Sequence, residues 1–203
     1  MYRDDAVSEV VGFSLILGMV ILSLGLLSVH AAPQITEDLE YSQNDNVLRQ
    51  FAAFKYDLDL FLAAENTGVY GRTVFTFVPE QTSFSVFSFS DLTPGRISME
   101  RGVPAFQNNG TDYYPVVFTY QSANRYAENI LLELRAGTLT VDPSGLTIPA
   151  FGTEDSASSI VVTDSSFVPW VVSGVEQVIV EYRLEHVLHS DSGTLYVFDF
   201  SMR

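Results

Sequence analysis

Twenty consecutive residues, 10–29, carry no charged side chain, and this segment constrains the chain more than any other feature. As an α-helix it spans about 30 Å, which is the thickness of the hydrocarbon core of a bilayer. A helix of this length in a soluble core normally shows a polar face, whereas this one has only small residues among large apolar ones. The segment therefore predicts a membrane-spanning helix.

The charges that flank this segment indicate its orientation. Arg3 and the chain amine precede it, and no Lys or Arg follows it before Arg49. Because positive charge is retained on the cytoplasmic side, we expect the N-terminus inside the cell and the rest of the chain outside. The alternative is a secretory signal peptide cleaved near Ala31 and Ala32, which would release a soluble protein such as a secreted enzyme.

Small residues are aligned along the predicted membrane helix. Ser14, Gly18, Gly25 and Ser28 recur at spacings that helical geometry places on one face. Small residues let helices approach closely in lipid or in a dry bundle, so we expect this face to pack against other helices. The alternative is that Gly and Ser reflect only their general frequency in membrane helices.

The remaining composition excludes several classes of protein. The chain has 203 residues, no Cys and a formal net charge of −15 at pH 7. The lack of Cys excludes disulfides, thiolate metal sites and Cys nucleophiles, and the acidity argues against nucleic-acid binding. Acidity with a single lysine, Lys55, is typical of a salt-rich habitat, where ions screen self-repulsion. An ordinary soluble acidic surface is the alternative.

After Pro33 the sequence predicts that the helix continues with an apolar stripe at heptad spacing. The stripe consists of Val47, Phe51, Phe54, Leu58 and Phe61. Asn66-Thr67-Gly68 is the predicted stop, since glycine suits the left-handed turn at a helix end. We expect the stripe to pack on the sheet of its own domain, with a coiled coil between neighbouring chains as the alternative.

From residue 69 onward, alternating apolar and polar residues predict about nine strands. They cover residues 69–78, 84–89, 96–103, 114–120, 129–141, 160–163, 167–172, 178–185 and 196–200. One helix followed by strands predicts an α+β fold: a long membrane and stalk helix, then an antiparallel all-β sandwich-like domain or a sheet wrapped around the helix. The predicted divisions are a leader over 1–5, the helix over 6–68 and an extracellular β-rich domain over 69–203.

Catalytic and metal-binding motifs are absent from the sequence. No G-x-S-x-G, H-E-x-x-H or Walker-type loop occurs, so we expect no enzyme and no cofactor. His186 and His189 lie three apart near a strand end, which points them to opposite faces, and we expect no metal site. Asp155, Asp164 and Asp191 stand in turn-like stretches where carboxylates hold Ca²⁺ in other proteins, but they lack EF-hand spacing.

Asn109-Gly110-Thr111 is an N-glycosylation sequon in a predicted loop. A chain of this composition contains roughly one such sequon by chance. Because the predicted orientation places this loop outside the cell, we expect Asn109 to be a candidate for modification.

The N-terminal sequence carries a family resemblance. The stretch A-V-S-E-V-V-G-F over residues 6–13, between a short charged leader and a long apolar helix, resembles the start of archaeal type IV pilins and pilin-like proteins. The resemblance implies that a prepilin peptidase cuts between Asp5 and Ala6. It also implies that the apolar helix stays on the mature chain and packs into a filament core.

Glu9 stands where this family commonly has Pro. A carboxylate at the edge of lipid needs a cation or hydrogen bonds. By resemblance to bacterial pilins, the freed amine of a neighbouring subunit is the candidate partner of Glu9, and a place in the headgroup region is the alternative. The segment over residues 118–126 also resembles a recurrent segment in uncharacterised pilin-like proteins of salt-loving archaea, which brings no known activity.

Together these features predict a structural or adhesive surface subunit without catalytic function. Its expected partners are membrane lipid, like subunits through the N-terminal helix and the prepilin peptidase. Its expected location is the cell membrane with an extracellular domain, or an extracellular pilus. The alternative is a bitopic membrane protein that never polymerises and whose ectodomain binds a ligand.

Overall fold

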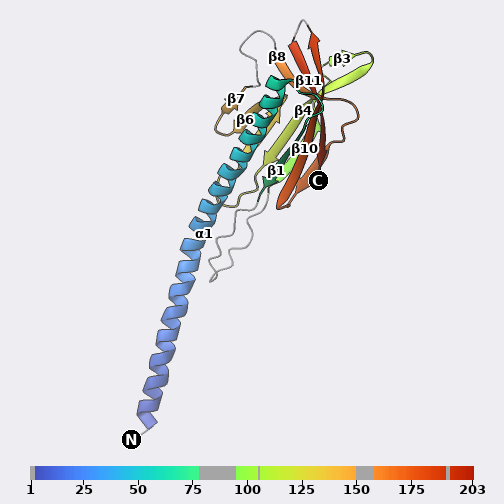
Figure 1. Ribbon diagram of the computed structural model, residues 1–203. Helices are drawn as coiled ribbons and strands as arrows, with labels where there is room; N and C mark the ends of the chain where they lie inside the picture. Colours follow the sequence, from blue (N-terminus) through green and yellow to red (C-terminus); the bar gives the residue numbers. More distant parts are fainter. Residues whose placement is uncertain (1–2, 78–94, 105, 150–157, 191–192) are drawn as a thin grey trace.

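A computed structural model of the chain describes residues 3–77, 95–104, 106–149, 158–190 and 193–203. At residues 3–9, 32, 158, 159 and 190 it describes the backbone alone. Figure 1 shows a long helical rod whose N-terminal half projects freely and whose C-terminal half lies along a curled sheet. The predicted α+β fold, a long N-terminal helix followed by a strand-rich domain, is confirmed.

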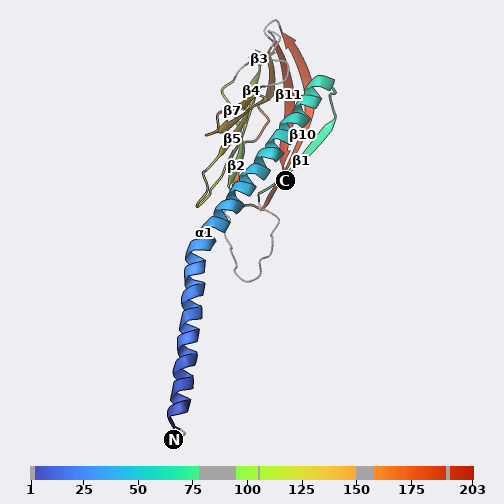
Figure 2. The same ribbon diagram turned by 90° about the vertical axis from the view of Figure 1, so that its left-hand side faces the viewer.

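The helix α1 runs over Arg3–Ala64 and contains Pro33 in its interior. Proline has no N–H to donate to the carbonyl four residues earlier, and its ring crowds the preceding turn, so it bends a helix. Figure 2 shows that α1 changes direction in the stretch that the colour bar places between residues 25 and 50. The rod is therefore continuous but bent between its free half and the half that lies on the sheet.

The end of α1 comes slightly before the predicted stop. Glu65 adopts a φ of 48°, and its N–H donates to the Phe61 carbonyl at 3.0 Å. Gly68 is also left-handed, with a φ of 81°, and its N–H donates to the Leu184 carbonyl at 2.8 Å. Two left-handed residues thus turn the chain from the helix into the first strand.

The described residues form eleven strands. They are β1 Tyr70–Thr76, β2 Arg96–Arg101, β3 Phe106–Asn108, β4 Thr111–Gln121, β5 Leu131–Arg135, β6 Thr138–Asp142, β7 Leu146–Ile148, β8 Ser158–Thr163, β9 Trp170–Ser173, β10 Gln177–Ser190 and β11 Gly193–Met202. The order in the sheet is β1-β10-β11-β8-β4-β5-β6-β7, with β2 between β4 and β9 and β3 beside β4. Among these strands, β11 and β8 pair in parallel and the other pairs are antiparallel.

Three features of the sheet differ from the sequence expectation. The segment predicted as one strand over 129–141 is a hairpin, because Ala136 and Gly137 both have positive φ and form a two-residue turn between β5 and β6. The three-residue strands β3 and β7 were not predicted, since they are too short to show alternation. The predicted strand over 84–89 lies outside the described residues.

The alternation in the last two strands is confirmed. The residues predicted to share the apolar faces are all buried, namely Val178, Val180, Tyr182 and Leu184 of β10 and Tyr196, Phe198 and Phe200 of β11. The side chains between them, including Arg183 and Asp199, therefore point to the opposite face of the sheet.

The curled sheet wraps around the C-terminal half of α1. Val47, Phe51, Phe54 and Leu58 are each at most 2% exposed, which confirms that the stripe packs on its own domain. Phe61 is only partly buried, and Leu62 takes the next buried position instead. A straight helix has 3.6 residues per turn, so its buried face drifts away from a strict heptad repeat.

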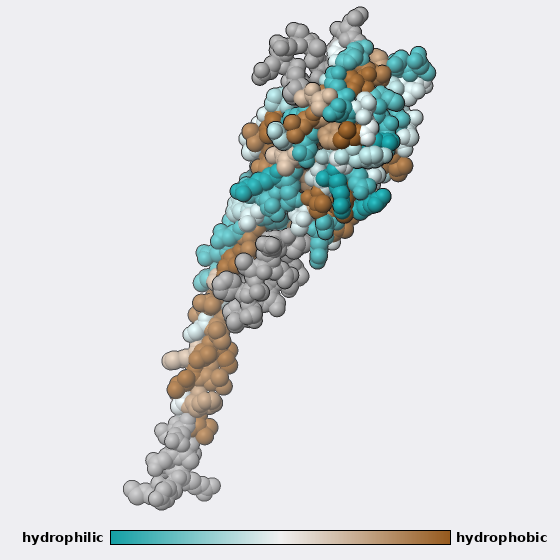
Figure 3. Space-filling model, in the orientation of Figure 1, coloured by the Kyte–Doolittle hydropathy of each residue, from teal (hydrophilic) through white to brown (hydrophobic). Residues whose placement is uncertain are grey.

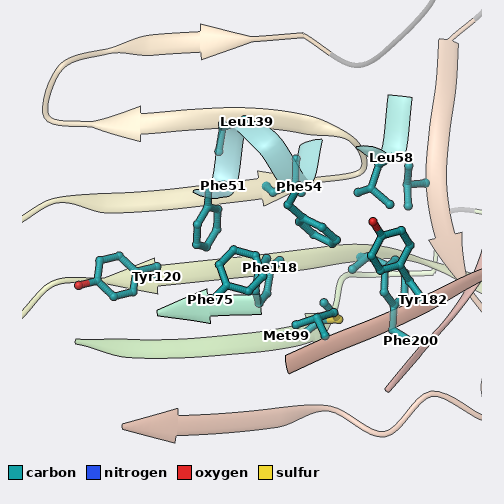
Figure 4. Packing of buried hydrophobic residues seen from close by; sticks show 14 of the residues in the cluster. Phe51, Phe54, Leu58, Phe75, Met99, Phe118, Tyr120, Leu139, Tyr182 and Phe200 are labelled. Atoms are coloured by element: carbon teal, nitrogen blue, oxygen red, sulfur yellow. The ribbon is translucent and has the colours of Figure 1, made fainter. Parts of the chain in front are cut away.

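Aromatic rings join the helix to the sheet. Figure 4 shows Phe51 and Phe54 pointing from α1 toward Phe118 of β4. The Phe51 ring stacks on Phe118 at a centroid distance of 4.9 Å, and the Phe54 ring meets Tyr182 of β10 edge-on at 5.3 Å. Such pairs add to the hydrophobic stabilisation. The second half of the rod is thus part of the core of the domain.

Two buried tyrosines make the stability of the domain sensitive to alkali. Burial raises the pKa of both Tyr120 and Tyr182 to about 12. In the unfolded chain these tyrosines ionise near pH 10. Their contribution to the stability is therefore unchanged below that pH and is lost as the pH rises to 12. We expect the free energy of unfolding to fall by about 2–3 kcal/mol per tyrosine over this interval. Urea unfolding at a series of alkaline pH values measures this, and the double variant Tyr120→Phe/Tyr182→Phe should show the flatter dependence.

Candidate membrane anchor and its junction with the domain

Residues 10–29, in the half of α1 that projects from the domain, are apolar on all sides. The large apolar side chains from Val10 to Val29 are 48–69% exposed, and an 18-residue window of the helix has a mean hydropathy of 2.6 with none of it buried. Figure 3 shows this hydrophobic rod below a domain whose visible surface is mixed. An apolar surface of this size is not stable in water. The helix is long and apolar enough to cross a membrane.

The predicted face of small residues is formed and open. The hydroxyl of Ser14 donates to the Val10 carbonyl at 2.8 Å and that of Ser28 to the Leu24 carbonyl at 2.9 Å, so neither hydroxyl needs an outside partner in an apolar medium. A Cβ added at Gly18 or Gly25 meets nothing within 4 Å. The described part of the chain therefore leaves this face uncovered, and its packing against other helices stays a prediction.

The residues of the predicted processing site lie at the start of the rod. Asp5, Ala6 and Glu9 belong to the first turns of α1, and their side chains lie outside the described part of the structure. Cleavage before Ala6 and the pairing of Glu9 with a neighbouring amine therefore stay predictions.

A carboxylate that the sequence did not single out marks the point where the rod enters the domain. Glu40 is 3% exposed and is the first buried side chain along the described part of α1. Its Oε1 accepts the N–H of Arg125 at 2.7 Å, and its Oε2 accepts those of Tyr126 at 2.8 Å and Ala127 at 2.7 Å. Three backbone donors of one loop thus replace water around one buried carboxylate.

Three amide side chains extend this junction along the helix. Gln43 Nε2 donates to the Phe77 carbonyl at 2.5 Å, and Asn44 Nδ2 donates to the Glu128 carbonyl at 3.2 Å. Gln50 accepts the N–H of Thr76 at 2.6 Å and donates to its carbonyl at 3.0 Å. Gln43 and Asn44 belong to the polar run over residues 42–46 that precedes the apolar stripe, and Gln50 lies within the stripe. All three bond to backbone of the domain.

The loop that Glu40 binds is itself fixed by side-chain hydrogen bonds. Asn129 Oδ1 accepts the N–H of Asn124 at 2.7 Å, and Ser122 Oγ accepts the N–H of Ile130 at 2.8 Å. Because Glu40 is the first buried side chain along the described part of α1 and binds a loop that is itself fixed, we expect the junction to influence the direction of the rod relative to the sheet.

The other sequence candidates lie apart from this junction. His186 and His189 are exposed, and no group of three or more His, Asp or Glu placed to hold a metal occurs among the described residues. Asp164 Oδ1 accepts from the N–H of Ser166 at 2.7 Å and so closes a turn, while Asp155 and Asp191 lie outside the described residues.

The sequon sits at a hairpin tip. Asn109 and Gly110, with φ of 48° and 82°, are the exposed turn between β3 and β4, and Thr111 begins β4. This position leaves the Asn109 side chain accessible, and its glycosylation stays a prediction.

The fold and the rod together define an α+β protein with a long apolar N-terminal helix that also serves as the spine of its domain. Residues 6–70 match the model of a family described as a family of unknown function, DUF7289. The match covers less than half of the chain, and it spans the anchor, the junction residues on α1 and the rest of the helix to the start of β1. Comparison with curated proteins and with solved structures gave no match.

Proposed function

We propose that this protein is a pilin-like surface subunit of the archaeal type, held in the cell membrane by residues 10–29 with its strand-rich domain outside. The observation that carries the proposal is the single rod, whose first half is exposed and apolar while its second half is the spine of its own domain. The resemblance of residues 6–13 to pilin N-termini supports the same organisation.

Assembly into a filament would replace the contacts of α1 with lipid by contacts with the α1 helices of neighbouring subunits. Lipid tails are as apolar as leucine, so this exchange gains close packing rather than hydrophobic free energy. The open face with Ser14, Gly18, Gly25 and Ser28 lets backbones approach, and the hydroxyls on it are already satisfied within the helix. The junction at Glu40 then holds each domain at a defined angle to the helical core.

The test of this proposal is the native N-terminus of the protein and the fraction in which it occurs. We expect mass spectrometry to find a mature chain that starts at Ala6, and we expect shearing of cells to release the protein with filaments. An intact Met1 in the native protein would contradict the filament assignment.

A second candidate is a bitopic membrane protein that does not polymerise. The specific observation in its favour is that apolar side chains surround the free half of α1 on all sides, so lipid alone satisfies that surface. Recovery of the protein only in membranes after shearing would select this candidate over the pilin-like one.

Membrane anchoring is tested by arginine substitutions at two exposed leucines of α1, one in the apolar segment and one in the half that packs on the sheet. Leu22→Arg places a charge at the middle of the apolar segment, which costs about 3 kcal/mol of membrane insertion. We expect alkaline carbonate extraction to move this variant toward the soluble fraction. Leu60→Arg, on the half of the helix that packs on the sheet, should stay in the membrane like the original chain. Equal extraction of the two variants would show that residues 10–29 are not the anchor.

A further inference from the structure

One face of the sheet formed by β1, β10 and β11 points away from α1. The residues of the inner face, such as Val180, Tyr182 and Phe200, are buried in the core, so their neighbours along each strand point outward. This outer face carries Tyr70, Arg72 and Val74 on β1, Glu181 and Arg183 on β10, and Asp199 on β11. None of these six residues is buried.

The outer face has one free positive charge and one free negative charge, on different strands. In the middle strand, Arg183 and Glu181 each have an ion-pair partner. Arg72 and Asp199 are exposed and have neither an ion pair nor a side-chain hydrogen bond with any described residue. Because β10 lies between β1 and β11, these two free charges stand about 10 Å apart across the sheet. The face is thus positive along β1 and negative along β11.

The outer face is balanced in charge although the chain is strongly acidic. With a formal net charge of −15, copies of the chain repel each other over most of their surface. Three arginines and three acids lie on or beside this face, namely Arg72, Arg183 and Arg203 with Glu181, Glu185 and Asp199. A second copy therefore meets no net repulsion when it approaches this face.

Anchoring in one membrane restricts how two copies can meet. Both rods point in the same direction, so a two-fold axis that relates them lies along the membrane normal. The strands lie lengthwise along α1 (Figure 1), because Gln43 bonds Phe77 below one end of β1, and Phe61 contacts Tyr182, which is opposite Gly71 near the other end. A two-fold axis along the rods therefore also runs roughly along the strands.

Rotation about this axis brings complementary charges together. When the outer faces of two copies meet, β10 lies over β10, and β1 lies over β11 of the partner subunit. Arg72 then faces Asp199 of the partner subunit, and symmetry forms the same pair a second time. The two residues differ by two positions in the strand register, a step of about 7 Å that the long arginine side chain spans. We propose that this outer face is the contact surface for a second copy of the chain in the same membrane.

This inference rests on the anchoring of residues 10–29 and not on filament assembly. Three strands of this length present on the order of 400 Å², which is below the roughly 800 Å² per partner of a stable soluble complex. Anchoring compensates for the small area, because it confines the copies to one surface and raises their effective concentration. Tyr70 and Val74, which are 71% and 39% exposed, supply the apolar part of the contact. We therefore expect dimers in vesicles and monomers in dilute micelles.

The first experiment locates the contact by cross-linking. The chain has no Cys, so a single introduced cysteine reports only contact between copies. Ile179→Cys places a thiol on β10 next to the two-fold axis, and a short bismaleimide links two such thiols in vesicles. We expect covalent dimers from this variant and monomers from the matched control Thr140→Cys, on the exposed surface of β6. Absence of dimers from Ile179→Cys, or equal amounts from the two variants, would overturn the proposal.

Charge reversal tests the pair itself. In the Ile179→Cys background we expect Arg72→Glu and Asp199→Arg each to weaken association about tenfold, since two ion pairs become two like-charge contacts. Both reversals in one chain should restore the dimer, a rescue that a misfolded variant does not show. Arg135→Glu, an equal change of charge on the exposed surface of β5, is the matched control and should leave the dimer unchanged. A missing rescue, or an equal loss in Arg135→Glu, would show that Arg72 and Asp199 do not form the contact.

Alkaline carbonate extraction of the same vesicles separates failure of the anchor from failure of the contact. A chain that stays in the membrane without cross-linking overturns the contact and leaves the anchor in place. A chain that is extracted overturns the anchor and this inference with it. None of these outcomes depends on whether the chain forms filaments.

Discussion

Phe51→Ala is expected to lower the free energy of unfolding of the domain by about 4 kcal/mol. The Phe51 side chain is fully buried, and its ring lies 4.9 Å from Phe118, 5.2 Å from Phe75 and 6.4 Å from Tyr120. Alanine removes these contacts and leaves a cavity between the helix and two strands, β1 and β4, which the packed surroundings fill only in part. A loss of this size is a large fraction of the stability of an ordinary domain.

The measurement is urea unfolding of the full chain in micelles, followed by the fluorescence of Trp170. This residue is the single tryptophan of the chain, and its ring lies 5.8 Å from Phe118, so its emission reports on the core around Phe51. Tyr56→Ala, on the exposed side of the same helix, is the matched control and should cost less than about 1 kcal/mol. Similar losses for the two variants would mean that α1 does not pack on the sheet through Phe51.

The sequence predicted those parts of the fold in which apolar residues recur at a regular spacing. Val47, Phe51, Phe54 and Leu58 were expected on one helix face, and they are buried together because a helix that packs on one surface must repeat its apolar residues every three or four positions. The same holds for β10, where alternation placed Val180 on the inner face. Local patterns predict which face of an element is buried.

The features that the sequence missed depend on contacts between distant residues. Glu40 and Ala127 are 87 residues apart, and nothing near Glu40 in the sequence distinguishes a buried acceptor from the exposed acids around it. A polar recess lined by Thr111, Arg183 and Asp199 likewise joins β4, β10 and β11, which are distant in the sequence. The one available signal was the polar run over residues 42–46, which contains Gln43 and Asn44 and comes directly before the apolar stripe. Polar residues on the inner face of a helix indicate a hydrogen-bonding partner.

The second large effect is expected at the junction, where Glu40→Gln should cost about 3 kcal/mol of stability. Glutamine has the same size and keeps one oxygen, but its amide group is a donor and faces N–H donors. At least one of the backbone N–H groups of Arg125, Tyr126 and Ala127 then stays buried without an acceptor. Asp38→Asn is the matched control, because it removes the charge of an exposed acid two residues earlier on the same helix.

Hydrogen exchange separates this local effect from general destabilisation. In Glu40→Gln we expect the amides of residues 125–127 to exchange faster than those of β4 and β5, which flank the loop and keep their ladder bonds. In Asp38→Asn the exchange of all three regions should match that of the original chain. Uniform acceleration across the domain, or an unchanged loop, would show that Glu40 does not hold it. A selectively loosened loop would leave α1 attached to the sheet through Phe51 and Phe54 but free to change its direction at the point where it leaves the domain. The carboxylate at position 40 would then control the angle between anchor and domain separately from the packing that holds them together.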